Sequence, residues 1–134
     1  MPAFFVVYLS MPKNRRYVLR SSLPSLNDYI DAERGYWASA ATIKKAATIN
    51  VQKEVMTQNR KPVNGMMDVD IYWITPNNRE DADNVYFGVK FILDGLVKAK
   101  VLGQDGRKNV RFVSHKIRTI KGKRMIIVEL IPVK

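Results

Sequence analysis

The chain lacks cysteine entirely, and its 134 residues include a single histidine, His115. The absence of cysteine excludes disulfides, thiolate zinc sites and a cysteine nucleophile, and it fits a reducing compartment. One histidine leaves no histidine-based metal cluster. No apolar stretch approaches the ~20 residues of a membrane span, and the run Phe4–Leu9 is too short for the core of a signal peptide. We therefore expect a cytoplasmic protein that has no membrane partner.

Several motifs of small-molecule chemistry are also missing. The sequence contains no phosphate-binding loop of the Walker type and no glycine-rich dinucleotide fingerprint. No serine has a plausible base and orienting group for nucleophilic catalysis. We therefore expect no small-molecule cofactor.

Acidic residues are scarce: 12 Asp and Glu stand against 23 Lys and Arg, which gives a net charge of +11 and a pI of about 10.0. Such an excess on a small chain predicts attraction to a polyanion, with nucleic acid as the first candidate. An anionic membrane surface is the rival, but it usually selects one strongly amphipathic basic helix. Here the basic residues are scattered along the chain, which favours nucleic acid over a membrane or a merely soluble basic protein.

The length suits one domain over residues 1–134, and 46% hydrophobic residues are typical of a folded one. Ser25 is a candidate helix N-cap, with Asp28 at the third helical position. Apolar periodicity predicts helices over residues 36–58 and 83–100, and strands over 4–9, 17–20, 63–74, 110–119 and 125–133. The last two strands are expected to form a hairpin through residues 120–123. The pattern predicts an α+β fold: a mostly antiparallel or mixed sheet with two main helices packed on it.

The expected helix 83–100 has two distinct faces. One face is an apolar stripe formed by Val85, Val89, Ile92 and Leu96. Asp83, Lys90 and Asp94 fall within about 20° of one another on nearly the opposite face. The helix is therefore expected to pack one side on the sheet and to present a carboxylate–ammonium–carboxylate line on the other.

Ordinary structural roles can also explain these charged residues. Asp81 or Asp83 can serve as the N-cap of the helix, and Asp94 can pair with Lys90 or Lys98 at helical spacing. Asp105 lies in a glycine-flanked turn past the far end of the helix. It would return to the charged face only if the following strand ran antiparallel alongside the helix.

The order of these residues resembles a known family. Asp81-Ala82-Asp83-Asn84, then Lys90, then Asp94-Gly95-Leu96, then Asp105 resembles the pattern of the RusA Holliday-junction resolvases. The segment Pro24-Ser25-Leu26-Asn27-Asp28-Tyr29 is also similar to a stretch of that family, so the resemblance runs from Leu23 to the C-terminus. The lysine lies about one helical turn further from the aspartate pair than in the family pattern.

The resemblance implies a RusA-like fold and a homodimeric, Mg²⁺-dependent endonuclease, often encoded by a phage or prophage, that resolves four-way DNA junctions. Asp81, Asp83 and Asp105 would be the metal ligands and Lys90 the catalytic lysine, with Mn²⁺ as a substitute metal. Carboxylates suit Mg²⁺, which prefers oxygen ligands, and bound metal can activate water and stabilise a leaving oxygen. An isologous dimer suits paired cuts in a junction with approximate twofold symmetry.

Basic residues near this site are candidates for DNA phosphate contacts, which supply affinity without sequence information. They are Lys44, Lys45, Arg79, Arg107, Lys108, Lys116 and Arg118. His115 is expected to be exposed or to face DNA. Tyr86 and Phe87 are expected to pack in the core, with wedging into a junction as the alternative. Gly88 is expected to mark a close packing contact.

Two hypotheses from other classes stand beside the nuclease. The first is a non-catalytic DNA- or RNA-binding module, in which the carboxylates are caps and salt-bridge partners. The second is a basic scaffold protein that binds an acidic partner and does not distinguish branched from linear DNA.

Overall fold

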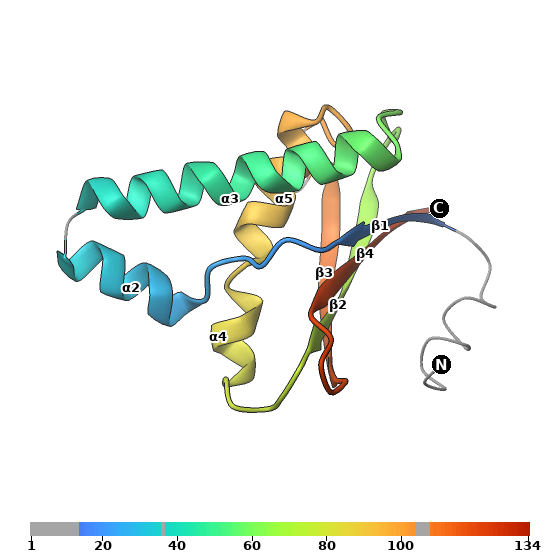
Figure 1. The fold of residues 1–134 in the computed structure, drawn as a ribbon. Coiled ribbons are helices and arrows are strands. Elements are labelled where there is room, and N and C mark those ends of the chain that lie inside the picture. The colour runs from blue at the N-terminus through green and yellow to red at the C-terminus, as the bar shows by residue number, and fades with distance from the viewer. Residues whose placement is uncertain (1–13, 36, 104–107) are drawn as a thin grey trace.

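The computed structural model describes residues 14–35, 37–103 and 108–134. In this part of the chain, a four-stranded mixed sheet carries its helices on one face (Figure 1). The expected α+β fold class is confirmed. The strand expected over residues 4–9 lies outside the described residues.

The sheet is built from β1 (Arg15–Leu19), β2 (Met67–Thr75), β3 (Val110–Thr119) and β4 (Met125–Pro132). The strands lie in the order β1-β4-β2-β3. β4 pairs antiparallel with both β1 and β2, whereas β2 and β3 run parallel. The strands expected over 17–20, 63–74, 110–119 and 125–133 are confirmed with small changes of boundary.

The expected hairpin between the last two strands is wrong, because β2 lies between β3 and β4. The connecting residues 120–124 cross the end of β2, where the N–H of Ile120 donates to the carbonyl of Thr75 at 2.9 Å. Gly122 has a φ of 75°, as a tight turn requires. The turn residues reverse the chain, but a reversal does not make the two strands neighbours. β2 is largely buried and suits the centre, whereas exposed charges along β3 suit an edge.

The helices are α2 (Leu26–Gly35), α3 (Trp37–Gln58), α4 (Ala82–Tyr86) and α5 (Val89–Lys98). α2 begins with a capping box, since the N–H of Asp28 donates to Ser25 Oγ at 3.2 Å and the N–H of Ser25 donates to Asp28 Oδ2 at 3.1 Å. The expected N-cap at Ser25 is confirmed, and α3 matches the helix expected over 36–58.

The core lies between the sheet and the pair α3–α5. Met67, Val69, Ile71 and Trp73 of β2 face the helices, as the alternation predicts. The stripes of α3 and α5 meet them, with Val51, Val55, Ile92 and Leu96 all at most 1% exposed. This burial fixes the orientation of α5 on the sheet and therefore the direction of its polar side.

The single helix expected over 83–100 is wrong in one respect, because the chain forms two helices there. α4 ends at Tyr86 and α5 starts at Val89, with Gly88 at the joint. A Cβ at Gly88 would lie 3.1 Å from Cη2 of Trp73 and 3.3 Å from Cδ1 of Leu23. The expected close packing at Gly88 is confirmed, and this packing coincides with the break in the helix.

Side chains of α3 satisfy the outer edge of β1. Gln58 accepts from the N–H of Val18 at 2.8 Å and donates to its carbonyl at 2.7 Å. Glu54 accepts from the N–H groups of Arg20 and Ser21, both at 2.9 Å. Because these hydrogen bonds hold the backbone after β1, they fix the path of the chain toward Ser22 and the start of α2.

On the sheet face opposite the helices, the side chains of β2 are more apolar than expected for a half-buried strand. Tyr72 and Ile74 of β2 are 6% and 1% exposed and cluster with Ile127 of β4. Beside them, Glu129 is buried and accepts from Arg16 Nε at 2.8 Å. The alternation therefore identifies the inner face correctly but misses the apolar content of the outer one.

No helix in the described ranges is long and apolar enough to cross a bilayer.

Candidate functional site

Asp81 and Asp83 lie at the start of α4, just beyond the end of β2. Asp81 is the N-cap residue, with φ −67° and ψ 151°, and its carbonyl accepts from the N–H of Val85 at 3.2 Å. Its side chain makes no capping hydrogen bond. Asp83 lies in the first turn, and both residues are exposed. The backbone thus starts the helix without the Asp81 carboxylate, which stays open to solvent.

Asn84, the next residue, holds this helix start in place. It is only 8% exposed. Its Oδ1 accepts from the N–H of Asn27 at 2.8 Å, and its Nδ2 donates to Glu80 Oε2 at 2.9 Å. One amide therefore links the start of α2 to the loop before α4. The sequence contains a signal for this residue, because Asn84 directly follows the aspartate pair at the position where α4 begins to face the protein interior.

Lys90 and Asp94 form an ion pair at 3.2 Å along α5. The lysine side chain is 52% exposed and the aspartate side chain 25% exposed. The expected pairing at helical spacing is present, and an exposed pair of this kind contributes about 0.3–0.5 kcal/mol. The pair fixes the direction of the lysine without burying its charge.

Asp105 and Arg107 lie outside the described residues. Their described neighbours are Gly103, which follows α5, and Lys108, which precedes β3. The start of β3 pairs with the start of β2, as Val110 lies beside Met67, whereas Asp81 follows the end of β2. Figure 1 shows α4 and the start of β3 at opposite ends of the sheet.

The other candidate cations are spread over more than one surface. Lys44 and Lys45 border a groove of about 400 Å³ between α3 and α5, together with Lys98. Lys116 and Arg118 project from β3 on the far side of the sheet, where Lys116 Nζ lies 5.3 Å from the Tyr72 ring. Arg79 and Lys108 are exposed in loops.

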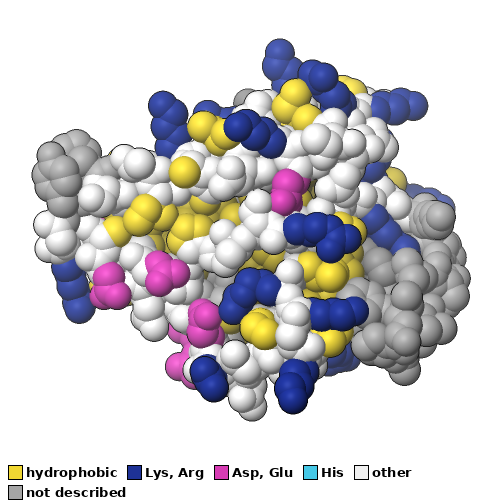
Figure 2. Space-filling model, viewed as in Figure 1, with side chains coloured by type: hydrophobic (Ala, Val, Ile, Leu, Met, Phe, Trp, Pro, Cys, Tyr) yellow, Lys and Arg dark blue, Asp and Glu magenta, His cyan; other side chains and the backbone are white. Residues whose placement is uncertain are grey.

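Acidic side chains, by contrast, gather over α2 and α4, while lysine and arginine cover much of the same view (Figure 2). The acidic surface is defined by the exposed acidic residues of these elements, which are Asp28, Asp31 and Glu33 of α2, Asp83 of α4, and Glu80 and Asp81 directly before α4. In so basic a protein, a phosphate backbone near this surface would be repelled unless a cation lay between them.

His115 is neither exposed nor directed away from the protein, and that expectation is wrong. Its ring stacks on Tyr86 with centroids 4.6 Å apart, and its Nδ1 accepts from Trp73 Nε1 at 3.0 Å. Burial lowers the pKa of His115 below its usual value. The histidine lies on the helix-facing side of β3, so it packs against α4.

Tyr86 and Phe87 pack internally, as expected. The Phe87 ring lies 5.3 Å from the Tyr29 ring and meets Phe91 edge-to-face at 5.7 Å. These contacts attach α2 to the α4–α5 joint and leave neither ring projecting as a wedge.

The carboxyl groups whose pKa values are shifted lie on the sheet face opposite the helices. A hydrogen bond from Arg111 lowers the pKa of Asp68, and desolvation by burial raises the pKa of Asp70 despite the attraction of Lys116. The Arg111–Asp68 pair is at 2.8 Å. These groups have structural partners and lie on β2 and β3, away from α4.

Among the residues that the structure describes, no three histidine, cysteine or acidic side chains are grouped as a metal site. Asp81 and Asp83 supply two exposed carboxylates, and the third expected ligand is outside the described ranges. Neither the models of known protein families nor the curated proteins searched match the chain.

Proposed function

We propose that the protein is a Mg²⁺-dependent, structure-selective endodeoxyribonuclease that resolves four-way DNA junctions by paired phosphodiester hydrolysis in recombination and repair. The observation that carries this proposal is the state of Asp81. A capping aspartate is the ordinary explanation for this position, yet the Asp81 side chain makes no capping bond. Two exposed carboxylates two residues apart at a helix start are therefore available to a cation.

The chemistry of the donors fits a hard divalent cation. Mg²⁺ prefers carboxylate oxygens and retains several waters, which suits two exposed side chains at a helix start. When bound, Mg²⁺ neutralises phosphate charge and lowers the pKa of a coordinated water. Asp81 and Asp83 would hold the ion, and Asn84 would fix the turn that carries them. Lys90, directed by Asp94, would stabilise charge that develops on the phosphate.

In this proposal, a site that includes Asp105 is shared between the two protomers of a homodimer. β2 extends over nine residues, so its two ends are roughly 26 Å apart. Asp105 is two residues from Gly103, a reach of at most about 7 Å. The spacing therefore favours a metal site that combines Asp81 and Asp83 of one protomer with Asp105 of its partner. A twofold dimer forms two such sites, as paired cutting of a junction requires.

The test is cleavage of a mobile four-way junction and of a linear duplex, each with Mg²⁺ or with EDTA. We expect paired cuts in the junction only with Mg²⁺. Asp81→Asn should abolish cleavage and leave binding equal or tighter, because it removes negative charge near a phosphate. Since Asp81 makes no side-chain cap, its thermal unfolding should stay close to that of the unchanged protein.

The matched control is Asp31→Asn, which makes the same charge change on the exposed surface of α2. It should cut like the unchanged protein. Cleavage that survives Asp81→Asn would overturn the site, and cleavage in EDTA would overturn the metal dependence.

Nucleic acid binding without catalysis is the second candidate, and the groove bordered by Lys44, Lys45 and Lys98 favours it. These lysines can contact phosphates whether or not the acidic surface takes part in binding. In that case a junction would bind but stay intact, Asp81→Asn would change nothing, and a Mn²⁺ titration would detect no site.

A further inference from the structure

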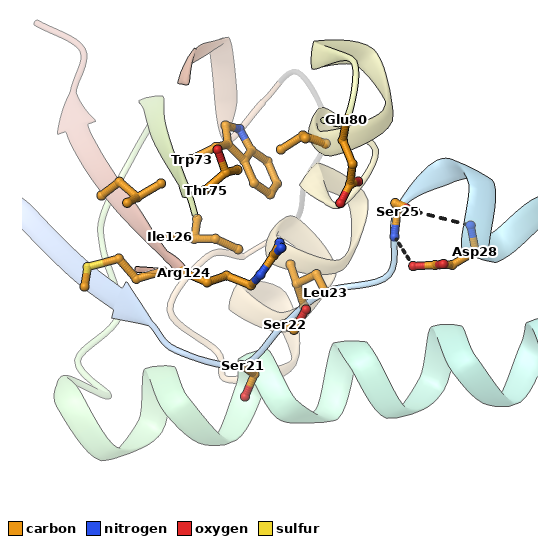
Figure 3. A pocket seen from close by; sticks show the side chains of 13 residues that line it. Ser21, Ser22, Leu23, Ser25, Asp28, Trp73, Thr75, Glu80, Arg124 and Ile126 are labelled. Carbon is orange, nitrogen blue, oxygen red and sulfur yellow. Dashed lines mark hydrogen bonds between the residues drawn. The ribbon is translucent and has the colours of Figure 1, made fainter. Parts of the chain in front are cut away.

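A cavity opens at the end of β2, next to Glu80, the residue that precedes Asp81. Its walls come from the segment before α2, the ends of β2 and α4, and the start of β4 (Figure 3). Glu80, which immediately precedes Asp81, stands on its rim. A ligand in this cavity would therefore lie next to the proposed scissile phosphate.

The floor of the cavity is apolar and rigid. Trp73 and Ile126 are 4% and 7% exposed, and Leu23 packs beside them. The Trp73 ring is held by Gly88 behind it and by its hydrogen bond to His115. The volume is about 190 Å³, below the roughly 300–1,000 Å³ of pockets for drug-sized ligands. The space therefore suits a single small ring system.

The polar lining includes two groups of opposite charge, Glu80 and Arg124, beside side chains that are bonded within the protein. Those bonded side chains are Asp28, which accepts from the N–H of Ser25, and Ser21 and Thr75, whose hydroxyls donate to Glu54 and to the carbonyl of Asn77. Figure 3 shows the Glu80 carboxylate and the Arg124 guanidinium turned toward the space between them. Asn84 occupies Oε2 of Glu80, and within the described residues no hydrogen bond or ion pair is formed by Oε1 or by Arg124. The two groups thus point into the cavity with bonding capacity unused.

We propose that this cavity receives one unpaired nucleobase that carries an exocyclic amine, from the nucleotide beside the scissile phosphate. The inference rests on the proposed function and adds a base preference to it. Glu80 accepts from the amine, as carboxylates accept from the amino group of cytosine, and Arg124 donates to a ring nitrogen, a carbonyl or the adjoining phosphate. Thymine has no exocyclic amine and leaves Glu80 unpaired.

A junction lowers the cost of this arrangement. Taking a base from a duplex stack costs a few kcal/mol, and the cost is least where pairing is already disturbed, as at a branch point. The rigid apolar floor then replaces part of the lost stacking. The cavity would therefore select both the branched structure and the base beside the cut.

The first experiment needs no cleavage. The protein with Trp37→Phe and ¹⁵N-labelled tryptophan has one indole signal, from Trp73, which can be followed by NMR as dCMP, dAMP or dTMP is added. We expect dCMP and dAMP to shift this signal and to bind about tenfold more tightly than dTMP. Glu80→Gln should remove that preference, and Arg124→Gln should weaken the binding of all three nucleotides.

Two variants control for loss of charge alone. Glu33→Gln on α2 and Arg60→Gln after α3 make the same changes on exposed side chains that do not line the cavity. Both should bind the nucleotides like the unchanged protein. Equal binding of the three nucleotides, or no response of the Trp73 signal, overturns the inference.

The second experiment places 2-aminopurine at the branch point of a junction and adds the Asp81→Asn protein. Fluorescence should rise on binding as the base leaves the stack, and Arg124→Gln should reduce the rise. A flat signal from a bound junction overturns base capture while leaving the nuclease proposal intact. A rise without any cleavage by the unchanged protein supports base capture and overturns the nuclease instead.

Discussion

Trp73 donates its indole N–H to Nδ1 of His115 at 3.0 Å, across the parallel pair β2–β3. The bond requires Nδ1 to lack a proton, so the neutral imidazole carries its proton on Nε2. Tyr86 covers the same ring, which ties α4 to the sheet through one histidine. Through Trp73, the contact also fixes the floor of the cavity beside Asp81.

The protein should lose stability as the pH falls below about 6.5, because of His115. Burial lowers the pKa of the folded histidine below its usual value of 6.5. Between the lowered value and 6.5, the unfolded chain binds a proton that the folded chain does not, so lower pH favours unfolding. Urea unfolding at steps from pH 7.5 to 5 should show this decline.

His115→Gln supplies the comparison. It is expected to be less stable at pH 7.5, where the stacked ring contributes, and to lose less stability on acidification. Asp68 and Asp70 stay in both proteins, so the difference between the two curves isolates the histidine. Parallel curves would show that His115 is not responsible.

Gly95→Ala should destabilise the protein by about 1–3 kcal/mol, as overpacking of a close contact does. A Cβ there would overlap Val51, whose own Cβ would lie 2.6 Å away, and would press on the backbone of α3. Gly35→Ala at the end of α2 is the control, because no atom lies within 4 Å of its added Cβ. Thermal unfolding should separate the two variants, and equal melting temperatures would contradict the packing.

The sequence predicts the elements better than it predicts their neighbours. Periodicity locates α3 and the inner face of β2, since both depend on which residues one element buries. It also locates β3 and β4 but fails for their pairing, because strand order is decided by long-range contacts. No local signal around Gly122 indicates that β2 lies between the two strands.

The site shows the same division. The sequence predicts the place of Asp81 and Asp83 at a helix start, because their spacing and order are local; their role as metal ligands stays a prediction. Arg124 is missed, since only the path of β4 brings it opposite Glu80. His115 is misjudged for a related reason: its exposure depends on where α4 packs, and α4 ends close to Gly88, which packs tightly against Trp73 and Leu23.

Lys90→Gln should lower kcat for junction cleavage by about a hundredfold or more, the usual effect of losing one donor to transition-state charge. Junction affinity should change little, because the lysine is one of many cations. Lys53→Gln, an exposed position on α3, should retain full kcat. An equal loss of kcat in both variants would show that Lys90 contributes only through the overall positive charge of the protein.

The sharing of one metal site between two protomers can be tested with a mixed dimer of Asp81→Asn and Asp105→Asn chains. Each variant alone should form an inactive homodimer. In the mixed dimer, one site combines both changes, while the other combines an unchanged Asp81 with an unchanged Asp105. If the ligands come from different protomers, that second site is intact and should nick one strand of the junction.

Differently tagged chains, refolded together and purified through both tags, give the mixed dimer for this assay. Single-strand nicking at up to half the rate of the unchanged dimer is expected, without paired cuts. If each site were built within one chain, both sites of the mixed dimer would carry a change and no nicking would appear. Because the roughly 26 Å along β2 separates the two ends of the sheet, nicking is the outcome that the geometry favours.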